Sequence, residues 1–251
     1  MRGGEVVIYV TPNRQAQRKE IPVADIRTEM VEFRSNGSTT PGFLARPSGD
    51  GPFPGVIVIQ EWWGLNENIK DIAQRFAAEG FAAFAPDLYH GRVTREPDQA
   101  QKMMMQLDMP LAAKELVKAT EYLAGQKYID GRGIGATGFC MGGGLAMTLA
   151  CKSPLIKAVA PFYGFPPDPI DMVKSLNGPA FLIFAENDAW ISPAVRENLE
   201  RALTRHGKKF EAKVYRGTHH GFFRDVDNDH HDTKASKDAW ERTLKLFRDN
   251  L

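Results

Sequence analysis

Residues 138–142 read Gly138-Phe139-Cys140-Met141-Gly142, which is the Gly-x-Ser-x-Gly spacing of a nucleophile elbow with cysteine in the place of serine. Residues 133–137 before it predict a short buried strand, and residues 143–150 after it predict a helix. The residue at such a strand–turn–helix junction is strained, and glycines two places away let the neighbouring backbone pass closely. Cys140 is therefore expected to project beyond the sheet at a helix N-terminus, which favours a thiolate.

A structural interpretation of Cys140 stays open at this point, because most cysteines are buried, inert apolar residues and a five-residue match is a weak signal by itself. Cys151 is the second of two cysteines, and we interpret it as structural. If one helix joins the two, they lie on the order of 16 Å apart along its axis. A disulfide needs Cα atoms within about 7 Å, so we expect two free thiols and a reducing compartment.

The composition is that of one globular domain. The chain has 251 residues and 43% hydrophobic residues, which is enough for one large core, and we divide it into an N-terminal extension, residues 1–24, and a single domain, residues 25–251. A formal net charge of +1 gives no attraction to nucleic acid or to a membrane. No apolar run approaches the roughly 18 residues of a membrane span. Residues 6–10, a candidate edge strand, are too short for a signal peptide, so we expect a cytoplasmic protein, as a monomer or weak homodimer.

The hydrophobic pattern predicts alternating strands and helices. Asn36-Gly37 predicts a hairpin between strands 26–33 and 42–46. Asn66 is a candidate cap for a helix that ends at Gly80. Further strands are expected at 55–60, 81–86, 133–137, 156–162, 180–185 and 210–215, and further helices at 97–106, 110–123, 143–150, 194–206 and 234–249. This order predicts an α/β fold with a mostly parallel central sheet and helices on both faces.

Four chemically capable side chains follow the carboxyl ends of predicted strands, where sites in parallel sheets form: Glu61, Cys140, Asp188 and His220. The order cysteine, acid, histidine is the nucleophile–acid–histidine order of the α/β-hydrolases. His220 would take the thiol proton, Asp188 would orient the imidazole, and the N–H groups of Trp62 and Met141 would stabilise an oxyanion.

Each assignment has a structural alternative. Asp188 follows Asn187 in a pattern common in turns. His219 adjoins His220, and one of the two is expected to be a solvated loop residue; the Gly221-Phe222 that follows favours His220. Glu61 could be a helix-entry or salt-bridge residue, because a buried carboxylate needs hydrogen bonds.

Four motifs resemble the dienelactone hydrolase family (carboxymethylenebutenolidases) over roughly residues 25–250. They are Gln60-Glu61-Trp62-Trp63-Gly64-Leu65-Asn66, Pro86-Asp87-Leu88-Tyr89, Gly138-Phe139-Cys140-Met141-Gly142-Gly143 and His220-Gly221-Phe222. The resemblance implies an α/β-hydrolase without cofactor or metal, with a Cys140-Asp188-His220 triad that cleaves a small ester or lactone. It also implies that Glu61 holds the resting thiol and swings away when substrate binds.

The resemblance further implies which residues bind substrate. Arg224 matches an arginine that grips a substrate carboxylate, and Trp63 and Tyr89 belong to the matching motifs. The helix 97–106 has no arginine at the place where the family has a second one, so an uncharged or bulkier ester or lactone fits as well as dienelactone. Met104 and its neighbours could form a pliable pocket wall, although such residues are more often core.

Two function classes remain beside hydrolysis. One is a thiol-dependent acyltransferase or peptidase on the same fold, and the other is a redox-sensing thiol protein without catalysis. A sensor needs no oriented base, so Asp188 and His220 speak against it. We reject a calcium loop at 225–236, because the sixth place is His230 and not glycine, and we interpret 230–232 as a solvated loop and not a metal site.

Overall fold

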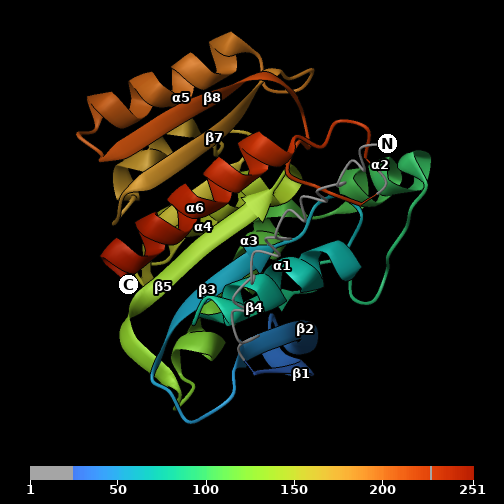
Figure 1. Ribbon diagram of the computed structural model, residues 1–251, viewed down its shortest axis with the longest axis vertical. Helices are drawn as coiled ribbons and strands as arrows, with labels where there is room; N and C mark the ends of the chain where they lie inside the picture. The colour runs from blue at the N-terminus through green and yellow to red at the C-terminus, as the bar shows by residue number, and fades with distance from the viewer. Residues whose placement is uncertain (1–24, 227) are drawn as a thin grey trace, which may run out of the picture.

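A single eight-stranded sheet forms the centre of the protein. The computed structural model in Figure 1 describes residues 25–226 and 228–251. The proposed extension, with its candidate edge strand, lies outside the described residues. The strands are β1 (Ile26–Ser35), β2 (Ser38–Pro47), β3 (Phe53–Ile59), β4 (Ala82–Pro86), β5 (Ile129–Phe139), β6 (Ile156–Phe162), β7 (Ala180–Asn187) and β8 (Phe210–His219).

The spatial order of the strands is β1-β2-β4-β3-β5-β6-β7-β8. β1 pairs with β2 and β2 with β4 in antiparallel fashion, and the remaining neighbours are parallel. The predicted hairpin turn is confirmed, since Asn36 and Gly37 have φ of 48° and 85°. The predicted α/β class with a mostly parallel sheet is therefore correct.

Helices cover both faces of the sheet, as Figure 1 shows. They are α1 (Glu67–Ala78), α2 (Pro97–Gln106), α3 (Met109–Ala124), α4 (Met141–Lys152), α5 (Pro193–Arg205) and α6 (Thr233–Asn250), with a short 3₁₀ helix η1 (Ile170–Ser175) before β7. Buried residues of α1 and α6 form one core on one face, and those of α3, α4 and α5 form another on the opposite face. None of these helices is long and apolar enough to cross a bilayer.

The start of α1 and its buried face are those that the sequence predicts. The side chain of Asn66 accepts a hydrogen bond from the N–H of Ile69 at 3.2 Å, which satisfies one of the unpaired donors of the first turn. The apolar stripe of α1 is buried, and Phe76 packs edge-on against Phe81, whose ring centroid is 5.9 Å away. Capping and amphipathicity thus fix both the start of this helix and the face it presents to the sheet.

Several strands are longer than predicted, and two of these extensions include an irregularity in the register. β5 begins at Ile129, four residues before the predicted start, because its first part pairs with Phe53 across an irregularity in the register. β8 extends to His219 and not to Tyr215, since the pair of Asn187 with His219 continues the ladder past a second irregularity. The longer β8 puts His220 directly at a strand end beside Asp188.

Candidate active site

Cys140 occupies the junction between β5 and α4. Its φ of 57° lies in the left-handed region, which costs a residue other than glycine of order 1–3 kcal/mol. The backbone N–H of Cys140 donates to the carbonyl of Phe162 at 3.1 Å, which holds the junction against β6. The side chain is partly exposed and borders a cavity, so the strained conformation presents the thiol to a space that a ligand can enter.

The two glycines of the motif are required by close packing of the backbone. A Cβ atom on Gly138 would collide with the carbonyl group of Gly142, and a Cβ atom on Gly142 would collide with the carbonyl oxygens of Ile59 and Gln60. The backbone at the start of α4 is therefore in direct contact with the ends of β3 and β5. This contact fixes the position of Cys140 relative to the residues that follow β3.

Asp188 and His220 meet at the ends of β7 and β8. Nδ1 of His220 lies 2.9 and 3.0 Å from the two carboxylate oxygens of Asp188, whose side chain is 1% exposed. Oδ1 of Asp188 also accepts from the N–H groups of Trp190 and Ile191. Burial raises the pKa of Asp188, but the hydrogen bonds from His220, Ile191 and Trp190 outweigh it and the pKa is lowered. Asp188 is thus an oriented carboxylate as well as a turn residue.

The second nitrogen of His220 is directed away from Asp188. Burial lowers the pKa of His220, but the bond to Asp188 and the nearness of Cys140 raise it to about 10 overall. Nε2 is buried and has no hydrogen-bond partner among the described residues. His219, in contrast, is exposed and stacks on His230.

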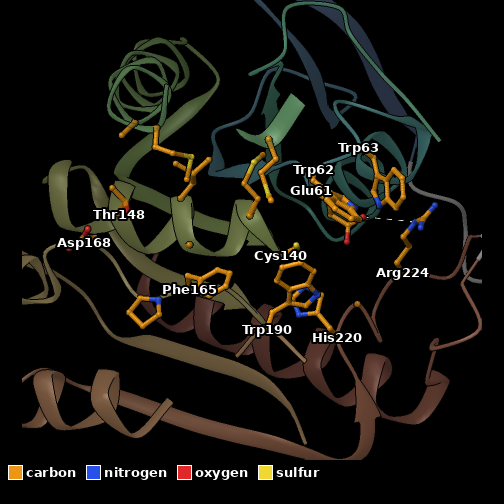
Figure 2. Close-up of a pocket in the computed structure, with 18 of the residues that line it drawn as sticks. Glu61, Trp62, Trp63, Cys140, Thr148, Phe165, Asp168, Trp190, His220 and Arg224 are labelled. Carbon is orange, nitrogen blue, oxygen red and sulfur yellow. Dashed lines mark ion pairs between the residues drawn. The ribbon is translucent and has the colours of Figure 1, made fainter. Parts of the chain in front are cut away.

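Glu61 follows β3 and is 4% exposed. Burial raises its pKa to about 7, although Arg224 and His220 act in the opposite direction. Its Oε2 lies 4.0 Å from Nε of Arg224, and the Arg224 guanidinium lies over the Trp63 ring at 5.0 Å from the centroid (Figure 2). The structure shows no hydrogen bond between Glu61 and Cys140, so the carboxylate is seen on the Arg224 side and not holding the thiol.

Tyr163 is a neighbour of the site that the sequence analysis missed. It follows β6, has φ of 40° and is fully buried, and its ring centroid lies 4.9 Å from that of His220. The pKa of Tyr163 is well above its ordinary value, because of burial first and then of Glu61 and Cys140 nearby. Its position directly after a strand end was the available signal.

A cavity of about 1020 Å³ opens in front of Cys140. Its walls bring together most of the predicted site residues: Glu61, Trp62, Trp63, Met104, Cys140, Met141, His220 and Arg224. Trp62 follows Glu61 at the end of β3, and Met141 follows Cys140. Met141 is also the first residue of α4, where N–H groups lack partners within the helix.

Two predicted contacts need separate mention. Tyr89 does not line the cavity; it is buried, and its hydroxyl donates to Sδ of Met141 at 3.5 Å. The three methionines of α2 separate, because successive residues of a helix point in different directions. Met103 is core, Met104 packs against the same core and also lines the cavity, and Met105 is exposed.

Other parts of the cavity wall were not predicted. Leu145, Thr148 and Lys152 lie on the face of α4 that begins at Met141, and helical spacing from the elbow could have indicated them. Phe165 and Trp190 come from loops after β6 and β7, for which no pattern in the sequence was available. Among the described residues, no group of three or more His, Cys, Asp or Glu side chains could hold a metal ion.

Comparison with known proteins places this geometry in a family. A family model described as "Dienelactone hydrolase family" matches residues 40–251. "Protein usf" of Aquifex pyrophilus is 39% identical over 89% of this chain and 99% of its own length. A protein of Aquifex aeolicus named "Putative carboxymethylenebutenolidase" is 35% identical, with the same two coverages.

A solved structure shares the fold over nearly its whole length. It is titled "Crystal Structure of Putative Dienelactone Hydrolase" and comes from Klebsiella pneumoniae. It superposes with a TM-score of 0.82 at 29% identity, over 89% of this chain and 98% of its own. Both the sequence and the architecture therefore match over the region that carries Glu61, Cys140, Asp188 and His220.

Proposed function

The chain belongs to the dienelactone hydrolase family, and from that premise we propose that it cleaves a lactone or small carboxylic ester through a thioester on Cys140. The observation that carries the proposal is the Asp188–His220 pair, which borders the same cavity as Cys140. Asp188 holds Nδ1 of His220 at 2.9 Å, and Nε2 is buried without a hydrogen-bond partner among the described residues. A base oriented in this way beside a thiol is the arrangement that nucleophilic acyl transfer requires.

The reaction proceeds in two halves. With its pKa raised to about 10, His220 holds the proton of the Cys140 thiol on Nε2, and the sulfur attacks the substrate carbonyl carbon as a thiolate. The oxyanion that forms accepts hydrogen bonds from the backbone N–H groups of Trp62 and Met141. The carbon–oxygen bond to the leaving alkoxide then breaks, His220 returns the proton to that oxygen, and the acyl group stays on sulfur as a thioester.

Water completes the cycle. His220 takes a proton from a water molecule, whose oxygen attacks the thioester carbon. The carbon–sulfur bond then breaks, the carboxylic acid product leaves, and the proton stays shared between His220 and the Cys140 sulfur as at the start. In a lactone the alkoxide and the acyl group belong to one molecule, so the product is a single hydroxy acid. Throughout, the ionised Asp188 keeps the imidazole in one orientation and stabilises its cationic form.

Glu61 and Arg224 also border the cavity that contains Cys140. We propose that Arg224, stacked on Trp63, orients a polar or carboxylate substituent of the substrate. Glu61 is 4.0 Å from the same guanidinium, so a substrate carboxylate competes with it for Arg224. When a substrate carboxylate occupies Arg224, Glu61 would be displaced from the guanidinium. The position of Glu61 relative to Cys140 would then differ between the free and the substrate-bound protein.

The proposal is tested with small esters, p-nitrophenyl acetate and a simple γ-lactone. Cys140→Ala should lower kcat/KM by at least about 10³-fold, because the nucleophile is lost. Cys151→Ala is the matched control, since that thiol is buried in the core away from the cavity, and it should retain turnover. Turnover that survives in Cys140→Ala refutes the mechanism.

The same proteins and assays distinguish the proposed hydrolase from the two alternative function classes. Amine and alcohol acceptors added to the assay distinguish an acyltransferase, which would form amides or esters faster than acid. Oxidation of Cys140 by peroxide in an otherwise inactive protein would favour a redox sensor.

A further inference from the structure

The cavity extends to both sides of Cys140. Figure 2 shows Glu61, Trp63 and Arg224 on one side of the thiol, and Thr148 and Asp168 on the opposite side. The proposed mechanism uses the first side. The second side, which we call the α4 arm, has no role in it and accounts for the remaining length of the cavity.

Helix α4 forms the floor of the α4 arm. Gly144, Leu145, Thr148 and Lys152 follow Met141 at intervals of three, four, seven and eleven residues, which places them on one face of the helix. From Met141 to Thr148 the helix rises roughly 10 Å at about 1.5 Å per residue. The arm therefore leads directly away from the nucleophile along a straight element.

The walls of the α4 arm are apolar. Met104 and Ala113 come from α2 and α3, and Phe165, Pro166 and Met172 come from the segment between β6 and β7. Charge is confined to the far end, where Lys152 and Asp168 are exposed. Phe165 keeps 48% of its surface exposed at the wall, and large apolar surface left open beside a cavity is typical of a binding site.

The chemistry at Cys140 decides which part of the substrate enters the arm. The leaving alkoxide must lie near His220, and the residues that follow it, Gly221, Arg224 and Asn228, border the same cavity. The acyl carbon remains bonded to sulfur, and α4 begins at the residue next to Cys140. The acyl chain and not the alcohol is therefore the group that continues along α4.

We propose that the α4 arm binds an unbranched apolar acyl chain, so that the preferred substrates are esters of medium-chain carboxylic acids. This inference rests on the proposed function. With carbon–carbon bonds of about 1.5 Å in a zigzag, a chain of roughly eight carbons reaches the level of Thr148. The open, charged end at Lys152 and Asp168 lets longer chains protrude into solvent.

The direct test is a series of p-nitrophenyl esters from acetate to octanoate. Each buried methylene multiplies kcat/KM by up to about fourfold, and we expect a rise of at least tenfold over the series. Thr148→Trp fills the arm and should lower the octanoate-to-acetate ratio of kcat/KM at least tenfold. Thr148→Val keeps the β-branched shape of the side chain and should keep that ratio within about twofold.

A second tryptophan variant keeps the test valid if Thr148→Trp does not fold. Met172→Trp, on the partly exposed η1, narrows the arm from the opposite wall and should lower the same ratio. A wild-type profile that is flat with chain length, or a ratio that neither tryptophan changes, overturns the α4 arm as the acyl site.

A binding measurement separates this inference from the mechanism. In calorimetric titrations of Cys140→Ala, octanoate should bind at least tenfold more tightly than butyrate, and Thr148→Trp should remove the difference. Equal affinities for octanoate and butyrate would contradict the α4 arm as the acyl-chain site, whether or not the protein hydrolyses esters. Turnover that persists without Cys140, combined with selective octanoate binding, contradicts the mechanism alone.

Discussion

Oε2 of Glu61 and Nε of Arg224 lie 4.0 Å apart, both buried and neither with a hydrogen-bond partner among the described residues. At this separation the pair attracts through charge but forms no hydrogen bond, so it only partly offsets the cost of burying Glu61. The balance explains why the pKa of Glu61 is raised to about 7 although a guanidinium is nearby.

Glu61→Gln should stabilise the protein more at pH 8 than at pH 5. With a folded-state pKa of about 7 against an ordinary 4.5, the folded state binds more protons between these values, so the stability of the wild type falls as pH rises through this window. Gln does not ionise. The gain in free energy of unfolding should grow by as much as ~3 kcal/mol between the two pH values, measured by urea denaturation.

Glu67→Gln is the control for that experiment, because its side chain is 87% exposed and should give a small difference at both pH values. A gain for Glu61→Gln that is the same at pH 5 and pH 8 contradicts the burial of an ionising carboxylate. The alkylation rate of Cys140 by iodoacetamide in the same variant reports whether Glu61 also acts on the thiol.

Arg224→Gln should destabilise the wild type at pH 8 far more than it destabilises Glu61→Gln. Removing the guanidinium leaves a buried carboxylate without its main opposing charge, whereas in the Gln background no such charge remains. A double-mutant cycle by denaturation should give a coupling energy of about 1–2 kcal/mol. Additive effects of the two substitutions would show that the 4.0 Å pair is energetically independent.

Asp188→Asn should lower kcat/KM by about 10³- to 10⁴-fold while the fold is retained, because the imidazole loses its orientation. The pKa of His220 depends on Asp188, so it should fall from about 10 in an NMR titration. The stability that the pair contributes is present below pH 6.5 and is lost as pH rises through the folded pKa; the variant should lack this dependence.

Asp171→Asn is the matched control, since that carboxylate is 60% exposed on the surface, where it pairs with Arg205 and His206. It should leave ester hydrolysis unchanged. Full activity of Asp188→Asn would mean that His220 needs no orienting partner.

Gly142→Ala should destabilise the protein by about 2–4 kcal/mol and impair hydrolysis, because the added Cβ collides with the carbonyls of Ile59 and Gln60. Gly125→Ala is the control: its Cβ meets the Glu121 carbonyl at 3.4 Å, an ordinary contact, at the end of α3. Thermal unfolding and ester hydrolysis measure the two effects. Equal stability of the two alanine variants would contradict the close approach of α4 to β3.

The sequence predicted elements better than their ends. The turn at Asn36-Gly37, the cap at Asn66 and the apolar runs of the central strands depend on nearest neighbours, so a local pattern reports them. The extension of β8 to His219 depends on its ladder with β7, and η1 depends on packing against α4 and α5, so neither appears in a local pattern.

The same division applies to the site. The sequence by itself determined which chemical groups stand at strand ends, since Glu61, Cys140 and Asp188 follow apolar runs and His220 follows the predicted strand 210–215. Only the tertiary structure decided that Glu61 lies beside Arg224, and that Tyr89 contacts Met141 without lining the cavity. The physical reason is the distance along the chain over which each feature is determined. Burial patterns and turn geometry depend on residues that are adjacent in the sequence. Contacts between side chains depend on strand register and helix packing, which involve residues far apart in the sequence.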